Sequence, residues 1–207
     1  MEYVNRSLHI RQIAADLLKQ YNINNRFEID ILSLISDLDQ DITYQFADLK
    51  GLAGFSCHDR KSDRYGIFFD LTTHNFYPTR TKFTGAHELG HIVLGHFKRV
   101  HINSAFFSDH ILETEANLFA DELLMPTKPI IDLHMSAMDI ISVYRVSTAA
   151  ALNKLRFIEQ NSIFLKHKAT EDIAQFIIDP KYLSDLVSIN VNQFRENLLD
   201  PDYEFSF

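Results

Sequence analysis

Two histidines four residues apart, with a glutamate directly after the first, carry the clearest chemical pattern in this chain: His87, Glu88 and His91 in FTGAHELGHIVLGH. On a helix, positions four apart lie about 40° apart around the axis and about 6 Å apart along it, so the two imidazoles point toward one place. This spacing is typical of a zinc clamp. Glu88 lies about 100° around the helix from His87, which makes it a poor third ligand but lets it reach a water on the metal. We therefore predict a zinc site in which Glu88 is the general base of a hydrolysis.

A structural interpretation competes with this one, because the histidines of an amphipathic helix can also satisfy each other or bond to water. The stretch carries apolar residues on several sides, which indicates a core helix. Buried imidazoles need polar partners, and a metal ion would supply one. We favour the metal site over the structural alternative.

The third ligand has to come from elsewhere. His96 lies five residues after His91, about 140° off its direction on a continuous helix, so we expect a helix-end or surface histidine there. The segment ETEANLFADELLMP, residues 113–126, offers glutamates, and Glu113 shares a helix face with small residues that would let two helices approach closely. We choose Glu113 as the third ligand, with Glu115 in reserve. The remaining interpretation of either glutamate is a solvated charge on a helix surface.

The rest of the pattern predicts the elements that hold these residues. Apolar spacing indicates helices over 4–18 and 29–38, and short aromatic and β-branched runs between 42 and 70 predict three antiparallel strands. Pro78 should break the chain, with Thr79 or Thr81 capping a helix that ends near Gly95. A further helix should run from about 108 to Leu124, and the remainder should be mostly helical. An α+β fold with a small antiparallel sheet and a helical C-terminal extension follows.

Composition limits the classes of protein to consider. With 207 residues and 46% hydrophobic content, the chain can bury a core without disulfides. A single cysteine, Cys57, favours a reducing compartment, so we expect a cytoplasmic protein, and we read Cys57 itself as a small core residue. No secretory signal or membrane span is expected. The formal charge of -8 argues against a broad nucleic-acid-binding face.

Two motifs together, RTKFTGAHELGH at 80–91 and ETEANLFADELLMP at 113–126, resemble the ImmA/IrrE family of zinc metallopeptidases. The resemblance implies a zincin-like peptidase domain over 1–128 and a helical extension over 129–207. It implies zinc held by His87, His91 and Glu113, with Glu88 as catalytic base. It also implies an endopeptidase that cuts a specific regulatory protein, such as a helix-turn-helix repressor of a mobile element or stress operon, and so a role in transcription regulation. The alternative is a zinc-containing regulator that acts by binding protein or DNA without catalysis.

Within the extension, residues 138–158 resemble a helix-turn-helix-like segment, with a turn at 145–147 and a second helix capped by Ser147. DNA reading is disfavoured, because Thr148 is followed by three alanines where base-contacting polar residues would be needed. His101 and His110 could stabilise an oxyanion, but we read them as ordinary loop histidines. We expect the aromatic-rich tail, 176–207, to be docked rather than free.

Overall fold

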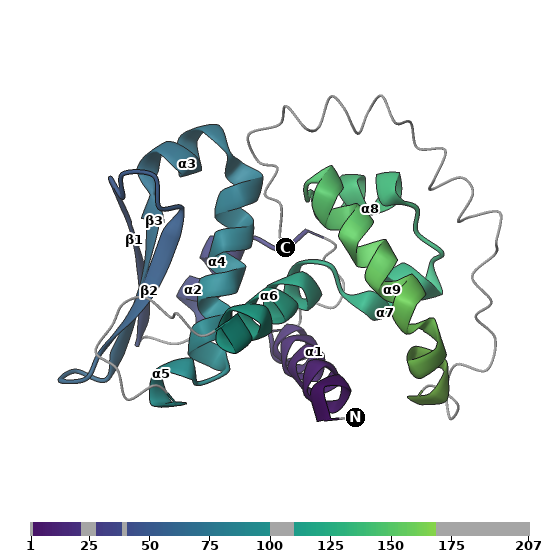
Figure 1. Ribbon diagram of the computed structural model, residues 1–207. Helices are drawn as coiled ribbons and strands as arrows, with labels where there is room; N and C mark the ends of the chain where they lie inside the picture. The colour runs from purple at the N-terminus through teal and green to yellow at the C-terminus, as the bar shows by residue number, and fades with distance from the viewer. Residues whose placement is uncertain (1, 22–27, 39–40, 100–109, 169–207) are drawn as a thin grey trace. The chain divides into compact units, whose positions relative to one another are not determined.

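The chain, as a computed structural model, is described over residues 2–21, 28–38, 41–99 and 110–168 (Figure 1). It has a mixed α+β fold with one three-stranded sheet and mostly helical content. Two compact units are present, Met1–Leu124 and Met125–Phe207. The expectations for His101 and for the tail from 176 onward fall outside the described residues.

The first unit contains the predicted helices and strands together with two short helices that were not predicted. Its elements are α1 (Glu2–Gln20), α2 (Ile31–Leu38), β1 (Ile42–Ala47), β2 (Gly54–Asp59), β3 (Arg64–Asp70), α3 (Leu71–Phe76), α4 (Pro78–Val93), α5 (His96–Arg99) and α6 (His110–Leu124).

The sheet has the order β1-β3-β2. The sequence analysis predicted three antiparallel strands, but only one of the two strand pairs is antiparallel. β2 and β3 form an antiparallel hairpin, whereas β1 pairs with β3 in parallel. The connection over 48–53 crosses the C-terminal end of β3 and so places β1 and β2 on opposite edges of that strand. Asp70 fixes this crossing, because its side chain accepts from Leu49 N at 3.0 Å and its own N–H donates to Ala53 O at 3.0 Å.

One face of the sheet is covered by helices. The covered side chains alternate along the strands, as expected for a sheet buried on one side: Ile67 and Phe69 of β3 are fully buried, and Ser56 of β2 is 1% exposed. α4 packs against β2 and β3 on this face, and α2 contacts both β1 and α4 (Figure 1). Gly85 of α4 allows this packing, because a Cβ there would lie 3.1 Å from the ring of Phe69.

The start of α4 differs from the prediction. Tyr77 is the N-cap without a side-chain capping bond, and Pro78 is the first helical residue, where its missing N–H costs nothing. Thr81, predicted as a possible cap, is instead buried within the first turns of the helix. The predicted end is correct: the helix stops at Val93, and Gly95 takes the left-handed conformation with φ of 68°.

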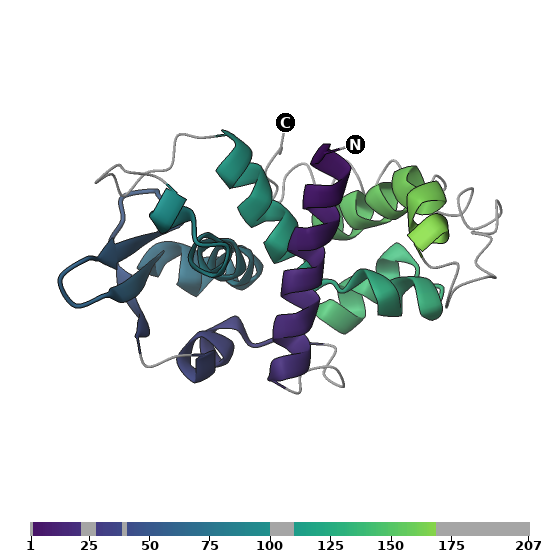
Figure 2. The same ribbon diagram turned by 90° about the horizontal axis from the view of Figure 1, so that it is seen from below.

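α6 lies between α4 and α1. Gly90 of α4 permits the close approach of α6, since a Cβ there would lie 3.3 Å from the Ala116 backbone and 3.0 Å from the Phe119 ring. On its other side α6 lies against α1 (Figure 2). There Arg11 of α1 forms ion pairs with Asp121 at 2.8 Å and Glu122 at 2.7 Å. α6 therefore presents one stripe to α4 and another to α1.

The second unit contains three helices within the described residues: α7 (Thr127–Asp132), α8 (Ala137–Tyr144) and α9 (Thr148–Lys168). Ser136 and Asp139 form a capping box at the start of α8, and Arg145 ends it in the left-handed conformation. Ser147 Oγ accepts from Ala150 N at 3.2 Å, so the predicted turn and the predicted cap of the second helix are both present. Over the parts of the chain that are described, no helix combines the length and the apolar character needed to cross a membrane.

Candidate metal centre

The HELGH helix turns two different faces toward two different neighbours. Glu88 lies on the face that packs against β2, where Thr84, one turn earlier, contacts Gly54. His87 and His91 lie toward α6. The candidate base and the two histidines therefore leave α4 in different directions.

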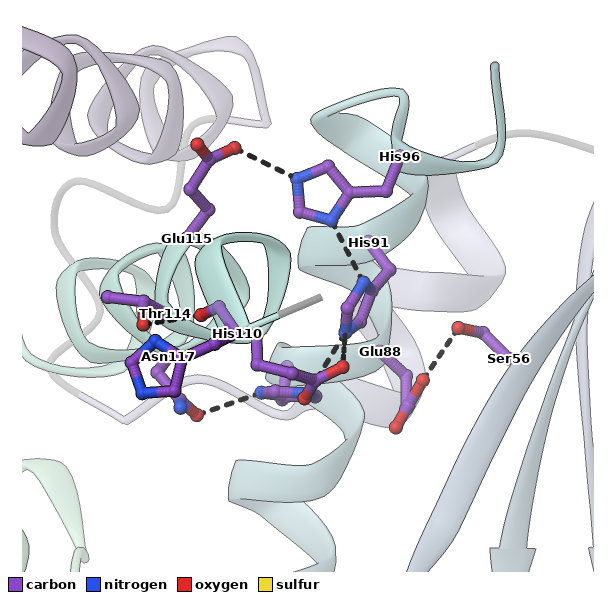
Figure 3. Close-up of polar contacts among 10 residues, drawn as sticks. Ser56, Glu88, His91, His96, His110, Thr114, Glu115 and Asn117 are labelled. Carbon is purple, nitrogen blue, oxygen red and sulfur yellow. Dashed lines mark hydrogen bonds and ion pairs between the residues drawn. The ribbon is translucent and has the colours of Figure 1, made fainter. Parts of the chain in front are cut away.

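The structure brings His87, His91 and Glu113 together into one cluster. The two histidine Nε2 atoms are 3.1 Å apart. The carboxylate of Glu113 reaches His87 Nε2 with one oxygen at 3.2 Å and His91 Nε2 with the other at 3.5 Å. Glu115, the reserve candidate, points away from this group and contacts other residues (Figure 3).

These separations fit a zinc ion. Tetrahedral zinc with ligands at about 2.0–2.1 Å requires neighbouring ligand atoms to lie about 3.3–3.4 Å apart. The three observed separations, 3.1, 3.2 and 3.5 Å, bracket that value. Two imidazoles and one carboxylate form a donor set of the kind found in catalytic zinc sites, which leave the fourth position open. The side chain of Glu113 is 40% exposed and that of His91 only 2%, so the cluster has one buried and one accessible end.

Electrostatics favours the ligand forms of His91 and Glu113 and the protonated form of His87. Burial, together with the nearby charge of His87, lowers the pKa of His91 to about 3, so His91 is neutral. Burial would raise the pKa of Glu113, but its hydrogen bond with His87 and the nearby imidazoles lower it instead, so Glu113 is a carboxylate. Burial alone would lower the pKa of His87, yet the hydrogen bond with Glu113 and the charges of Glu88 and Glu113 raise it. A positive charge is therefore drawn to this cluster, as to a cation site.

His87 has a second hydrogen-bond partner besides the cluster. Its Nδ1 lies 2.9 Å from Oδ1 of Asn117, which is four residues after Glu113 on α6. The amide oxygen accepts from Nδ1–H, which leaves Nε2 with the lone pair needed by a metal. The sequence analysis assigned no role to Asn117.

Among the described residues, Ser56 donates a hydrogen bond to Oε2 of Glu88 at 2.6 Å (Figure 3). Glu88 is 9% exposed, and its burial raises the pKa of its carboxyl, an effect that the positive charge of His87 and the hydrogen bond from Ser56 oppose. A carboxylate with a raised pKa is a stronger base, which suits proton transfer near neutral pH. The sequence analysis missed Ser56. The available signal was a polar residue at a covered position of a strand.

His96 is not the surface histidine that we expected. It is fully buried; its Nδ1 lies 2.9 Å from His91 Nδ1 and its Nε2 lies 3.2 Å from Glu115 Oε2. The prediction assumed a continuous helix, but the left-handed turn at Gly95 ends α4 and starts α5 in a new direction. The ring of His96 therefore returns to the back of His91 (Figure 3).

The remaining candidates have plainer positions. His110 is the first residue of α6 rather than part of a loop; it is exposed, and its backbone carbonyl accepts from Thr114 Oγ1 at 2.7 Å. Cys57 is half-buried in β2, and burial raises the pKa of its thiol, which disfavours the nucleophilic thiolate.

Comparisons with known proteins complete the description of the site. No curated protein matches the chain. Among solved structures, a Mycobacterium tuberculosis transcriptional regulator is similar to it with a TM-score of 0.47 and 13% sequence identity, over 73% of this chain and 46% of that one. The chain thus spans less than half of that protein's length, and a likeness at this level says nothing about activity. Residues 55–156, which contain the HELGH helix and α6, match the model of a peptidase family described as the IrrE N-terminal-like domain. This match supports the membership of the chain in the ImmA/IrrE family.

Proposed function

We propose that this chain is a zinc-dependent endopeptidase with a zincin-like core in its first unit, in which His87, His91 and Glu113 hold the metal. The observation that carries the proposal is the cluster of their three ligand atoms at the separations of a tetrahedral zinc site. A bound zinc ion would act as a Lewis acid on the scissile carbonyl and lower the pKa of a water molecule beside it. Family membership supports the same chemistry.

Glu88 has the role of general base in this proposal. Its carboxylate takes a proton from the attacking water while the water oxygen forms a bond to the carbonyl carbon. The proton then passes from Glu88 to the amide nitrogen as the carbon–nitrogen bond breaks. Ser56 donates to Oε2 of Glu88, and in this proposal Oε1 exchanges the proton. Burial raises the pKa of the Glu88 carboxyl, which makes its carboxylate a stronger base.

The proposed substrate is a specific regulatory protein in the cytosol, a helix-turn-helix repressor of a mobile element or stress operon. The resemblance of the two motifs to ImmA/IrrE proteins supports this substrate class, and the single cysteine supports the compartment. The second unit, with its helix-turn-helix-like segment, is proposed as an extension of the peptidase domain. We do not propose that it binds DNA, since the chain carries a formal charge of -8 and its second helix begins with Thr148 and three alanines.

A comparison of the wild-type chain with Glu88→Gln tests catalysis directly. Both proteins are expressed in cells that contain the candidate repressor, and new protein N-termini are mapped by mass spectrometry. We expect a cleavage within the repressor that depends on Glu88 and falls by about 10²–10⁴-fold in the variant, because the amide cannot take a proton. Zinc content, measured on protein without a histidine tag, should be the same in both.

The alternative, a zinc-containing regulator that acts by binding alone, makes the opposite prediction. In that case Glu88→Gln would keep its zinc and would inactivate the repressor as well as the wild type does. Such a result would rule out proteolysis as the working mechanism.

A further inference from the structure

A chain of three polar side chains leads from the candidate metal centre into the interior of the first unit. His91 Nδ1 lies 2.9 Å from His96 Nδ1, and His96 Nε2 lies 3.2 Å from Glu115 Oε2 (Figure 3). All three residues are at most 3% exposed. Glu115 in turn forms an ion pair with Arg6 of α1. These four side chains therefore connect four helices, α4, α5, α6 and α1.

Glu115 fixes which atoms donate and which accept in the two hydrogen bonds that link it to His96 and His91. Glu115 is buried and forms an ion pair with the guanidinium of Arg6, so its side chain is a carboxylate. An ionised carboxylate can only accept hydrogen bonds. The Nε2 atom of His96 must therefore carry the proton of the bond to Glu115.

The tautomer of His96 in turn determines which ring nitrogen of His91 carries the proton. His96 is fully buried and Arg6 already balances the charge of Glu115, so a second positive charge on His96 is disfavoured. A neutral His96 with its proton on Nε2 has only a lone pair on Nδ1. The bond between the two Nδ1 atoms then needs its proton from His91. A neutral His91 protonated at Nδ1 has its own lone pair on Nε2, the atom that faces His87 Nε2 at 3.1 Å and Glu113 at 3.5 Å.

We infer that His96, fixed by Glu115, is a positioning residue that sets the tautomer of His91, so that Nε2 of His91 is the atom available to bind the metal ion. The inference rests on the proposed function, because it assigns a role at the same site. The opposite arrangement, with a proton on His91 Nε2, would direct an N–H group at the metal position and block it.

Both ligand histidines thus carry a proton on Nδ1 and a lone pair on Nε2, but different partners hold them in this tautomer. His87, near the accessible end, bonds to the single amide of Asn117. His91, at the buried end, depends on a relay that ends in a charge. A buried imidazole without a partner costs free energy, and an apolar side chain would fill the place of His96 more simply if packing were its only role. The relay also accounts for Arg6, which gives α1 a contact with this site although α1 supplies no ligand.

Zinc affinity, measured by competition with a chromogenic chelator on untagged full-length protein, tests the inference. We expect His96→Leu to weaken zinc binding by about 10–100-fold, as is typical of the loss of a partner behind a ligand histidine. His96→Asn, whose side-chain oxygen can occupy the place of Nδ1 and accept from His91, should recover much of this loss. His74→Leu is the matched control, since His74 is half-buried in the same unit and its ring lies tilted against that of Phe46, with 4.3 Å between the ring centres. This change should leave zinc affinity unchanged.

A measurement on the wild-type chain covers the case in which His96→Leu does not fold. Nitrogen-15 NMR of the metal-free protein at pH 8, with labelled histidines, reports which ring nitrogen carries each proton. We expect His91 protonated at Nδ1 and His96 protonated at Nε2.

The outcomes separate the two proposals. A wild-type chain that binds zinc while His96→Leu binds it equally well overturns the positioning role and leaves the metal site intact. A metal-free wild type with the proton of His91 on Nε2 overturns the positioning role in the same way. A wild-type chain that binds no zinc contradicts the metal site itself, and the inference fails with it.

Discussion

The two faces of α4 hold their polar groups in different ways. Toward the sheet, Glu88 accepts a hydrogen bond from the hydroxyl of Ser56, and burial raises the pKa of its carboxyl. Toward α6, the imidazoles of His87 and His91 are each held from behind, by Asn117 and by His96. A base must gain and lose a proton, whereas a metal ligand must keep its lone pair in place. The difference in support between the two faces therefore matches the difference in the proposed roles.

Among substitutions where α4 and α6 face each other, Glu113→Ala should cause the largest loss of zinc affinity. This change removes the carboxylate ligand, so zinc affinity should fall by more than the 10–100-fold expected for a supporting residue. Chelator competition measures the effect. Thr114→Ala is the control, because Thr114 is half-buried on the same helix and its hydroxyl donates to the backbone carbonyl of His110 (Figure 3). Equal zinc affinities in the two variants would mean that Glu113 is not a ligand.

On the sheet face, Ser56→Ala should change the reaction rate and leave the metal in place. Loss of the hydroxyl removes a hydrogen bond that lowers the pKa of Glu88, so the acidic limb of kcat/KM against pH should move to higher pH. A bond of this kind to a charged group is worth about 1.5 kcal/mol or more, which corresponds to a shift of that limb by about one pH unit.

The control for Ser56 is Ser62→Ala, an exposed hydroxyl in the turn of the same hairpin. Both variants should keep wild-type zinc content. A Ser56→Ala protein with an unchanged pH profile would show that this hydroxyl does not act on the base.

A pair of glycine substitutions compares the two faces through packing alone. Gly90→Ala should push α6 away from α4, because its Cβ would meet the Ala116 backbone at 3.3 Å and the Phe119 ring at 3.0 Å. Gly85→Ala crowds Phe69 and Ile31 to a similar degree on the side of the sheet and α2. Each should cost roughly 1–3 kcal/mol of stability. Only Gly90→Ala should also weaken zinc binding, by several-fold, and equal losses of affinity from both would contradict the role of the α4–α6 approach.

The smallest expected effect is on thermal stability and comes from Asp70, whose carboxylate supports the fold and not the candidate metal site. Hydrogen bonds from the Thr73 and Leu49 backbones lower the pKa of Asp70. A carboxyl with a lowered folded-state pKa contributes stability above its unfolded pKa and loses it as pH falls through the folded value. Asp70→Ala should therefore lower Tm by a few degrees at pH 7, and the difference from wild type should shrink at acidic pH.

Zinc affinity should not change in Asp70→Ala, because Asp70 supports the strand crossing and α3 and has no contact with the cluster among the described bonds. Asp37→Ala, an exposed charge on α2, is the control for Tm. A Tm difference that widens toward acid would contradict the assigned cause.

The parts of the site that could be predicted are those set by helix periodicity. His87, Glu88 and His91 lie on one helix, and the small face of α6 correctly indicated which glutamate would approach them. His96 was misplaced because a helical angle was extended across Gly95, although that glycine had been recognised as a helix end. Ser56 could not be assigned to Glu88, because the contact joins residues 32 positions apart and depends on the strand register.

The sheet shows the same limit. Strand positions follow from local composition, and the predicted strands are present. The parallel pairing of β1 with β3 depends on how the 48–53 connection crosses Asp70, which alternation along a strand does not reveal. The signal for α3 was available, since Asp70 precedes Leu71-Thr72-Thr73 and caps the helix through Thr73 N at 2.8 Å.

A crystal structure of the untagged protein grown with zinc, with diffraction recorded on both sides of the zinc absorption edge, tests the central claim most directly. We predict one anomalous peak per chain about 2.0–2.1 Å from His87 Nε2, His91 Nε2 and a carboxylate oxygen of Glu113. A peak at any other group, or an ordered cluster without one at saturating zinc, would contradict the account.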